Sequence, residues 1–275
     1  MKQSTNLTSV PETMLWTLHN RAVEAMRSDG IIQDEHATRI YQSIDYHFEQ
    51  SFGKAEPSHA VRSLDFDREI SAFLERYPEG TIVNLGEGLE TQRFRVSSNK
   101  ALWLSVDLPE SIEIRERFIQ PDENQLHLAF SAFDRQWFDY VPKDKPLFIS
   151  AQGLFMYFKE QEVVKLIKDV AATFDNWRLM FDTIPVWLSN KSTSVTGWEK
   201  TPHYTTPKMP WGINRDQLTS YFKTQLPNGL HITDVGYSNF PRGVTKWVFM
   251  ALKSLPIIKN NAPTIVKIEP VNFSK

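Results

Sequence analysis

Two glycines and an aspartate follow predicted strands in this chain, at a spacing that suits a nucleotide-like ligand. The apolar run 82–85 predicts a buried strand, and Gly86 and Gly88 come directly after it. Glycine has no Cβ, so it can adopt positive φ and let a ligand approach backbone N–H groups. Asp107 ends the next predicted strand, residues 102–106, about 20 residues after the turn, where nucleotide-binding folds hold ribose hydroxyls.

The residue three positions after Gly88 narrows the choice of ligand. A dinucleotide fingerprint has a third glycine three residues after the second, and here that position is Thr91. The pattern therefore favours a ligand with one adenosine and no pyrophosphate, such as S-adenosylmethionine (SAM). A bare pair of glycines is equally explained by a tight turn, so the argument depends on Asp107 and on the helix predicted after each strand.

Composition excludes several classes of protein. The 275 residues carry a net charge of -2 with no basic block, so we expect no nucleic-acid partner. The chain has no cysteine, which excludes disulfides and thiolate catalysis and favours the cytoplasm as its compartment. We expect no membrane partner, since no apolar run reaches the about 18 residues that a spanning helix needs. Its 18 Phe and 8 Trp are enough to line an apolar pocket as well as a core.

The elements that position these residues divide the chain into three parts. Helical spacing in residues 12–28, 33–48 and 59–77 predicts an N-terminal helical cap over 1–78 that covers part of the ligand pocket. Strands then alternate with helices, which predicts parallel strands in a core over 79–252. The predicted strands are 81–85, 102–106, 125–130, 146–151, 178–184, 231–237 and 246–252, and the predicted helices of the core are 109–118, 159–174 and 214–224.

Two segments interrupt this pattern. Residues 185–212 are rich in Ser, Thr, Pro and Trp and are predicted to form a lid insertion, since a loop of this length is usually functional or disordered. Residues 253–275 are predicted to be a C-terminal tail. Five parallel strands finished by a hairpin-like pair predict an α/β protein with the class I SAM-dependent methyltransferase (Rossmann-like) fold, a seven-stranded mixed sheet.

Three motifs in the same order also resemble a known family. They are residues 83–91 (VNLGEGLET), 105–110 (SVDLPE) and 151–158 (AQGLFMYF), and weaker similarity extends from about residue 10 to 250. These motifs are similar to those of the leucine carboxyl methyltransferase superfamily, in particular its tetracenomycin-type polyketide O-methyltransferases.

The resemblance implies a SAM site that can be placed residue by residue. Arg62 would bind the methionine carboxylate, and Gln152 would hydrogen-bond near the methionine amine, in place of a glutamate found in many members. Gly86 and Gly88 would lie against the methionine moiety, and Asp107 would accept hydrogen bonds from the ribose. The adenine would lie against Ala132, Phe133 and Asp134. Without the motifs, a solvated helix arginine would be the preferred explanation of Arg62, and Phe133 is equally explained as a core residue.

Methyl transfer from a sulfonium is an in-line displacement, so the protein mainly positions the reactants and excludes water. A carboxylate acceptor needs no base, whereas a phenol, with a pKa of about 10, would benefit from one. Tyr157 and His203 are the candidates, Tyr157 through its motif and His203 only through its place in the long loop. No His/Asp/Glu cluster has the spacing of a metal site. The aromatic residues of the lid segment could form an acceptor pocket or simply pack; they are Trp187, Trp198, Tyr204 and Trp211.

Together these observations predict a SAM-dependent O-methyltransferase that modifies a carboxylate or hydroxyl of a small molecule, possibly aromatic or polyketide-like. Two alternatives remain open from the sequence. One is a non-catalytic SAM-binding or scaffold protein of the same fold, and the other is a nicotinamide-dependent oxidoreductase.

Overall fold

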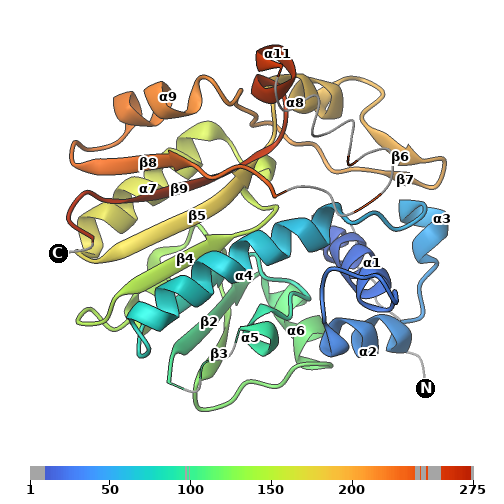
Figure 1. Cartoon of the computed structure of the whole chain (residues 1–275), viewed down its shortest axis with the longest axis horizontal. Helices are drawn as coiled ribbons and strands as arrows, with labels where there is room; N and C mark the ends of the chain where they lie inside the picture. Colours follow the sequence, from blue (N-terminus) through green and yellow to red (C-terminus); the bar gives the residue numbers. More distant parts are fainter. Residues whose placement is uncertain are drawn as a thin grey trace.

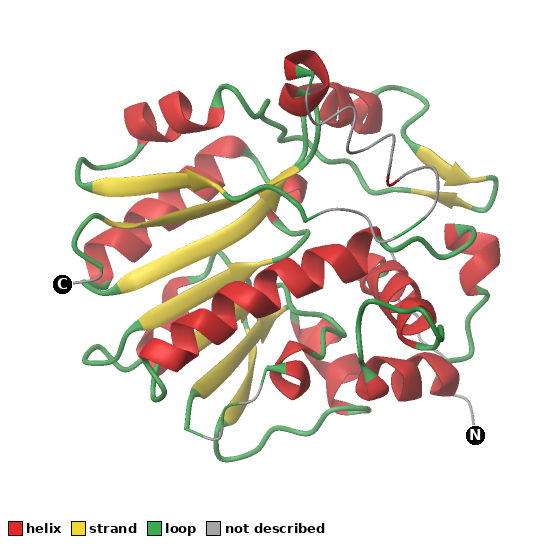
Figure 2. Ribbon diagram, in the orientation of Figure 1, coloured by secondary structure: helices red, strands yellow, loops and turns green. Residues whose placement is uncertain are grey.

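The computed structural model describes residues 10–96, 98, 100–238, 242, 246 and 255–273. A central sheet of seven strands, in the order β3-β2-β1-β4-β5-β9-β8, lies between layers of helices (Figures 1 and 2). Neighbouring strands from β3 through β5 are parallel, and β9 is antiparallel to both β5 and β8. This is the predicted class I methyltransferase fold with its mixed seven-stranded sheet.

The structure contains a large sheet, a separate two-stranded hairpin and the surrounding helices. The strands of the large sheet are β1 (Thr81–Leu85), β2 (Leu102–Asp107), β3 (Gln125–Ala129), β4 (Leu147–Ala151), β5 (Trp177–Thr183), β8 (Leu230–Asp234) and β9 (Thr264–Pro270), and β6 (Glu199–Thr201) pairs with β7 (Tyr204–Thr205) as a separate hairpin. The helices are α1 (Thr13–Ala25), α2 (Glu35–Ser43), α3 (Phe48–Phe52), α4 (Ser58–Arg76), α5 (Gln92–Arg95), α6 (Pro109–Glu116), α7 (Glu160–Thr173), α8 (Val186–Thr193), α9 (Leu218–Gln225) and α11 (Pro256–Asn260), with 3-10 turns η1 (Arg135–Tyr140) and η2 (Phe155–Tyr157).

Alternate residues of each central strand point to opposite faces, so each face has its own core. On one face Ile82 packs with apolar side chains of α4, including Phe66 and Phe73. On the other face Val83 packs with α7 and α9, whose contributions include Ile167 and Phe222. Helix α4, predicted as part of the cap, therefore covers the sheet itself, and Figure 1 shows it running along the strands.

Helices α1, α2 and α3 form a separate group beyond the carboxyl ends of the parallel strands (Figure 1). Their shared core joins apolar residues of all three helices to Leu89, next to the glycine turn, and to Tyr204 of the β6–β7 hairpin. The predicted helix over 33–48 is interrupted, because Ile44 has extended backbone (ψ 134°) and its side chain is buried in this core. The cap is thus fastened to the turn that was expected to bind ligand.

The predicted boundary between the core and a C-terminal tail does not match the structure. Residues 264–270 form β9, so the prediction that 253–275 is a tail outside the core is wrong. Val266 and Ile268 are fully buried between β5 and β8, which explains why this run belongs to the sheet. The last strand had been predicted at 246–252, which lies outside the described residues except for Lys246.

The segment 185–212 is not an unstructured loop, because it contains α8 and the β6–β7 hairpin. In the described part of the chain, no helix combines the length and the hydrophobicity needed to cross a bilayer.

Candidate active site

A cavity lies where the carboxyl ends of β1, β2 and β4 meet the cap. Ligands of open α/β sheets bind in the crevice outside these strand ends. Helix α1 and helix α4 close the opposite side. The residues that line the cavity are Val10, Pro11, Thr13, Met14, Thr17, Arg21, Arg62, Asn84, Leu85, Gly86, Glu87, Gly88, Glu90, Asp107, Leu108, Ser111, Ser131, Ala132, Ser150, Gln152, Gly153, Leu154 and Phe158.

The glycine turn forms one wall of this cavity. Gly86 and Gly88 have φ of 61° and 52°, as the sequence predicted for a sharp turn after β1. A Cβ on Gly88 would lie 2.8 Å from the Cβ of Met14, closer than side chains pack, so glycine also lets α1 approach the turn. Any larger residue at this position would displace the helix that lines the other side of the cavity.

Asp107 is held in place by two backbone N–H groups. The Gly88 N–H donates to Oδ2 at 2.7 Å, and the Leu108 N–H donates to Oδ1 at 2.8 Å. Burial raises the pKa of Asp107 above its usual value, while these two hydrogen bonds oppose the shift. A carboxylate has about four lone-pair directions, so beside these two N–H groups and the Ser111 hydroxyl Asp107 can still accept a hydrogen bond from a ligand hydroxyl.

Arg62 reaches the cavity from α4 and is nearly buried. Its Nη1 donates to Asp182 Oδ2 at 3.0 Å, and Asp182 Oδ1 accepts from the Gly153 N–H at 2.5 Å. Burial disfavours the charge, but Asp182 more than compensates and the pKa of Arg62 is raised. Gly153 has φ of 65°, and a Cβ there would lie 2.8 Å from Arg62 Nη1. The guanidinium is therefore a fixed, permanent cation in the wall, not a solvated helix arginine.

Two buried amide oxygens in the cavity wall lack a hydrogen-bond partner among the described residues. They are Asn84 Oδ1 at the end of β1 and Gln152 Oε1 just after β4. A buried acceptor that is left unpaired is costly, so such atoms in a cavity wall usually await a donor. An ammonium group supplies three donors. These oxygens together with Arg62 thus fit the amine and the carboxylate of an amino acid such as the methionine part of SAM.

A buried network of charges fixes the far end of the glycine turn. Arg21 of α1 pairs with Glu90 at 2.9 Å and donates to the Leu89 carbonyl at 2.8 Å. Arg95 of α5 pairs with Glu90 at 2.8 Å, with Asp34 at 2.6 Å and with Asp67 at 2.7 Å. Burial opposes ionisation of Glu90, but the two arginines hold its pKa well below the usual range.

Arg115 of α6 supports the same turn from beneath. Its Nη1 donates to the carbonyls of Gly88 at 2.9 Å and Glu90 at 2.8 Å, and its Nη2 lies 3.2 Å from Glu87 Oε2. Burial raises the pKa of Glu87, against the opposing effect of Arg115. The acid between the two glycines is therefore occupied inside the protein by Arg115 and by the Asn84 amide, which donates to it at 2.9 Å.

The three residues predicted to surround the adenine are placed differently from one another. Ala132 lines the cavity. Phe133 packs on Phe158, with ring centroids 4.3 Å apart, and Phe158 is the ring that lines the cavity. Asp134 accepts a hydrogen bond from the Gln136 N–H at 3.0 Å and so caps η1. Of the three residues, only Ala132 lines the cavity among the described residues. Phe133 lies behind Phe158, and Asp134 caps the first turn of η1.

The two candidate bases are not among the described residues that line the cavity. His203 is exposed on the β6–β7 turn, where its backbone N–H donates to Thr201 Oγ1 at 3.2 Å. Burial raises the pKa of Tyr157 to about 12, so this phenol keeps its proton near neutral pH. Neither residue is therefore placed as a proton acceptor.

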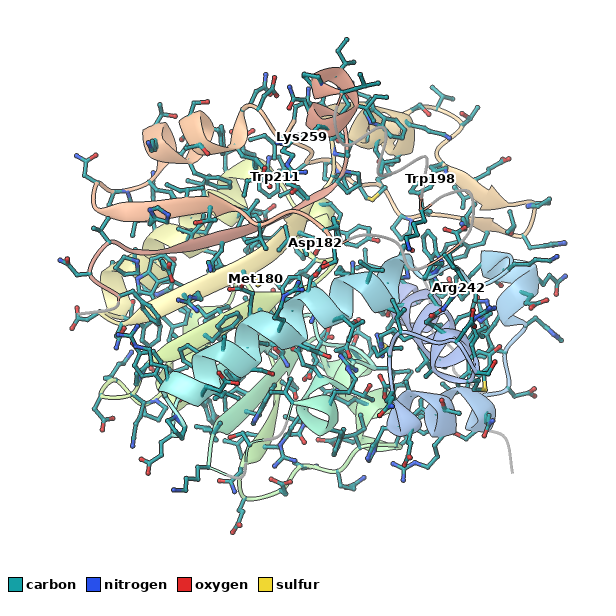
Figure 3. All side chains as sticks on the ribbon, viewed as in Figure 1. Met180, Asp182, Trp198, Trp211, Arg242 and Lys259 are labelled. Atoms are coloured by element: carbon teal, nitrogen blue, oxygen red, sulfur yellow. The ribbon has the colours of Figure 1, made fainter. Side chains whose placement is uncertain are left out.

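The aromatic residues of 185–212 separate into different surroundings. Trp211 is buried in the core against Phe222, and Trp187 is 51% exposed with its Nε1–H donated to the Asn261 carbonyl. Trp198 and Tyr204 instead contact Trp16 of α1, with ring centroids 6.2 Å and 6.5 Å from it. Figure 3 shows Trp198 and Trp211 well apart. None of the described cavity residues comes from 185–212.

Several residues of the site had not been assigned a role from the sequence. Asp182 lies in an ordinary strand and Arg115 in an ordinary helix, and their spacing does not distinguish them from the other charged residues of the chain. A weak signal existed for Asp182, an acid at the carboxyl end of a buried strand, as Asp107 is. No group of three or more His, Asp or Glu side chains within the described ranges could hold a metal ion.

Comparison with known proteins adds the family and its relatives. A family model described as leucine carboxyl methyltransferase matches residues 14–171. The tetracenomycin polyketide synthesis O-methyltransferase TcmP of Streptomyces glaucescens is 25% identical over 268 residues, which cover 94% of this chain and 96% of the relative. The S-adenosyl-L-methionine-dependent methyltransferase dpfgK of Gibberella zeae is 27% identical over 191 residues, 63% of this chain and 64% of the relative.

Solved structures support the same fold at lower identity. The plantazolicin methyltransferase BamL, in complex with a triazolic desmethylPZN analog and SAH, has a TM-score of 0.52 at 11% identity, over 95% of this chain and 99% of that chain. The CurJ carbon methyltransferase has a TM-score of 0.51 at 11% identity, over 94% of this chain and 67% of that chain. At these identities the likeness concerns the fold alone.

Proposed function

The chain belongs to the leucine carboxyl methyltransferase family and is a SAM-dependent methyltransferase, and from this premise we propose that it transfers the methyl group to an oxygen of a small molecule. The acceptor oxygen belongs to a carboxylate or to an acidic hydroxyl. Support for an oxygen acceptor comes from TcmP, named as an O-methyltransferase, whose similarity covers 94% of this chain. Family membership also sets aside a nicotinamide-dependent oxidoreductase.

Bound SAM supplies a methyl group on a positively charged sulfur. The acceptor oxygen forms the new O–C bond while the C–S bond breaks, and the electron pair remains on sulfur. What this chain must provide is a fixed approach of the oxygen to the methyl carbon and a site from which water is excluded.

We propose the roles in cofactor binding that the family resemblance implies, and the geometry of the cavity supports them. Arg62 binds the methionine carboxylate, and the unpaired oxygens of Gln152 and Asn84 accept from the amine. Asp107 accepts from the ribose hydroxyls, and the backbone of Gly86 and Gly88 allows close approach. The adenine lies beside Ala132 and Phe158, with Phe133 as the support of Phe158.

The arrangement of acids and bases favours an acceptor that arrives already ionised or nearly so. Three acids line the described cavity. Glu90 is paired with arginines, Glu87 is bound by Arg115 and Asn84, and Asp107 accepts from two backbone N–H groups. Tyr157 keeps its proton, and His203 is exposed on a distant turn. A carboxylate needs no proton acceptor, whereas a hydroxyl with a pKa of about 10 must first lose its proton.

Calorimetric titration of the purified protein with SAM, with NAD as the control ligand, tests the cofactor assignment. We expect SAM to bind and NAD to give no response. Formation of S-adenosylhomocysteine (SAH) is then measured with panels of aromatic carboxylates and hydroxyl compounds. SAM binding without turnover of any oxygen acceptor would favour the alternative of a SAM-binding scaffold, and the absence of SAM binding would refute the assignment.

A further inference from the structure

One half-buried polar residue beside the cavity has no part in the cofactor assignment. His59 lies on α4 three residues before Arg62, so the two side chains share a face of the helix. Its ring meets Trp16 of α1 edge-on, with ring centroids 5.4 Å apart. Trp16 also contacts Trp198 and Tyr204 of the segment 185–212. His59 therefore lies between the cofactor wall and the aromatic residues of that segment.

Two hydrogen bonds determine which nitrogen of His59 carries the proton. The Glu56 N–H donates to Asn20 Oδ1 at 3.2 Å, which fixes the orientation of the Asn20 amide. Asn20 Nδ2 must then donate to His59 Nδ1, 2.9 Å away. A neutral imidazole that accepts at Nδ1 carries its proton on Nε2. His59 thus presents a donor at Nε2, not a lone pair.

The surroundings of the ring keep it neutral. Burial lowers the pKa of His59 well below its usual 6.5, and three cations add to this effect: Arg62 on α4, Arg21 on α1 and Lys200 on β6. Glu90, after the glycine turn, acts in the opposite direction and is already paired with Arg21. At neutral pH the ring therefore donates from Nε2 without a positive charge.

The Nε2–H group is available to a ligand. Among the residues that the structure describes, it has no hydrogen-bond partner, and the ring is only half-buried. Its neighbours Arg62 and Arg21 both line the cavity, the first of them where we place the methionine carboxylate. A donor without a partner, between that end of the cavity and an aromatic wall, suits a small aromatic molecule rather than the nucleotide.

We propose that His59 is an acceptor-binding residue whose Nε2–H donates to an oxygen that neighbours the oxygen being methylated. This proposal rests on the proposed function and specifies its substrate class. The acceptor is a flat aromatic molecule that carries either a carboxylate or a hydroxyl beside a carbonyl. One oxygen of the pair receives the methyl group while the other is held by His59 and Trp16 packs against the ring.

The geometry also explains why a neutral donor is useful here. An imidazolium would form an ion pair with a carboxylate and draw negative charge away from the oxygen that must attack. A neutral N–H orients the acceptor with less effect on its charge. Because the Nε2 position is protonated, His59 cannot act as the proton acceptor through that atom.

The protonation pattern can be measured without any acceptor. Nitrogen-15 NMR of histidine-labelled protein distinguishes the two neutral forms, and His59→Gln identifies the signal by its loss. We expect the wild type to show the form protonated at Nε2. In Asn20→Asp the carboxylate accepts from Nδ1, so we expect that form, or the imidazolium, instead. A wild-type ring protonated at Nδ1 would overturn the proposal.

Binding is tested with three probes in the presence of SAH. 2-Naphthoate and 1-hydroxy-2-acetonaphthone have the second oxygen, and 2-naphthol, the matched control, lacks it. For the wild type we expect the first two to bind about tenfold more tightly than 2-naphthol, the size of one hydrogen bond to a polar or charged group. His59→Phe should abolish this preference, and His59→Gln, which retains a donor, should keep most of it.

The remaining outcomes separate this proposal from the proposed function. SAM affinity should be unchanged in His59→Phe and His59→Gln, which also shows that both variants fold. The proposal would be overturned if the wild type bound all three probes equally or bound none of them. It would also be overturned if the wild type and His59→Phe bound 2-naphthoate with equal affinity. In Asn20→Asp, 2-naphthoate should bind weakly under any condition in which NMR shows the ring protonated at Nδ1 alone, because Nε2 then presents a lone pair to the carboxylate. Loss of SAM binding in the wild type would refute the proposed function itself.

Discussion

At the scale of single residues, the site is built before any ligand is present. Asp107 is oriented by the Gly88 and Leu108 N–H groups, and Arg62 is oriented by Asp182. Such groups lose little freedom when a ligand binds, so their hydrogen bonds contribute more of their strength to affinity. The acceptors that remain free, on Asn84 and Gln152, are those that the amine would use.

Replacing Asp107 tests this pre-organisation. Asp107→Ala removes a charged hydrogen-bond acceptor, and such groups contribute about 1.5–3 kcal/mol. We therefore expect the Kd for SAM to rise about 10- to 100-fold in a calorimetric titration. Asp139→Ala, at an exposed position on η1, is the matched control and should bind as the wild type does. Equal affinity in Asp107→Ala would exclude the ribose assignment.

The pKa of His127, on β3, makes the stability of the fold depend on pH. Burial and the neighbouring Arg115 lower its pKa from 6.5 to about 4, and Arg115 Nε donates to His127 Nε2 at 3.3 Å. The folded state thus disfavours the protonated ring, whereas the unfolded chain accepts the proton near pH 6.5. The stability due to neutral His127 is fully present above about pH 6.5 and is lost as the pH falls toward 4.

Urea unfolding of wild type and His127→Gln at several pH values measures this contribution. Gln does not titrate and its carbonyl can still accept from Arg115, so its free energy of unfolding should fall less between about pH 6.5 and pH 4. Parallel curves for the two proteins would show that His127 does not contribute to the acid sensitivity.

From the sequence, residues of the cavity wall could be located where a backbone constraint marked them. Gly86, Gly88 and Asp107 follow predicted strands at a spacing imposed by the turn, and all three line the cavity. Arg62 required the family resemblance, because an arginine in a helix has no distinguishing spacing. The position of His203 could not be predicted, because the path of a loop cannot be read from composition, and the structure places this residue exposed on a turn.

At the scale of elements, the cap and the sheet are joined by charge as well as by apolar contact. Arg95 on α5 connects Asp34 at the start of α2, Asp67 on α4 and Glu90 after the glycine turn. All of these groups are almost entirely buried, so each depends on its partners. The turn, α2 and α4 therefore behave as one unit.

Arg95→Met tests the unit by leaving three buried carboxylates without this cation. Removal of one partner from a buried ion pair typically costs about 3–5 kcal/mol, and we expect a loss of unfolding free energy in this range together with weaker SAM binding. Arg93→Met is the matched control on the same helix, because Arg93 pairs with Asp122, which is largely exposed. That variant should lose less than about 1 kcal/mol. Similar losses in both would argue against a special role of the network.

The regular elements were largely predictable because a strand buried on both faces is a mostly apolar run, as in 82–85 and 147–151. The prediction failed where polar residues interrupt an element. Helix α8 contains Ser, Asn, Lys and Thr and is largely stabilised by its contacts, including Ser189 Oγ donating to the Met209 carbonyl at 2.7 Å. Strand β9 was missed because it lies within residues 253–275, which were predicted to be a tail.

At the scale of the whole molecule, β9 completes the sheet. It lies between β5 and β8 and is antiparallel to both, and Figure 2 shows these strands side by side in the sheet. Lys267 adds an ion pair with Glu69 of α4 at 2.9 Å. The predicted core boundary at residue 252 would have excluded this strand.

Truncation after Asn261 tests the importance of β9. The shortened chain would leave β5 with an unpaired edge and β8 without its partner, so we expect insoluble or unfolded protein by circular dichroism and gel filtration. Truncation after Phe273 removes only Ser274 and Lys275 and is the control, with a Tm close to that of the full chain. A soluble, SAM-binding chain ending at Asn261 would show that β9 is dispensable.

The position of β9 also has a consequence for synthesis on the ribosome. Every other strand leaves the ribosome before β9, yet β9 fills an inner place beside β5. Until it emerges, the edge of β5 that β9 occupies has no strand partner and can pair with other nascent chains. We therefore expect co-expressed chaperones to increase the yield of folded protein. Added SAM or slower heating acts only on chains that have already folded, so we expect either to have a smaller effect.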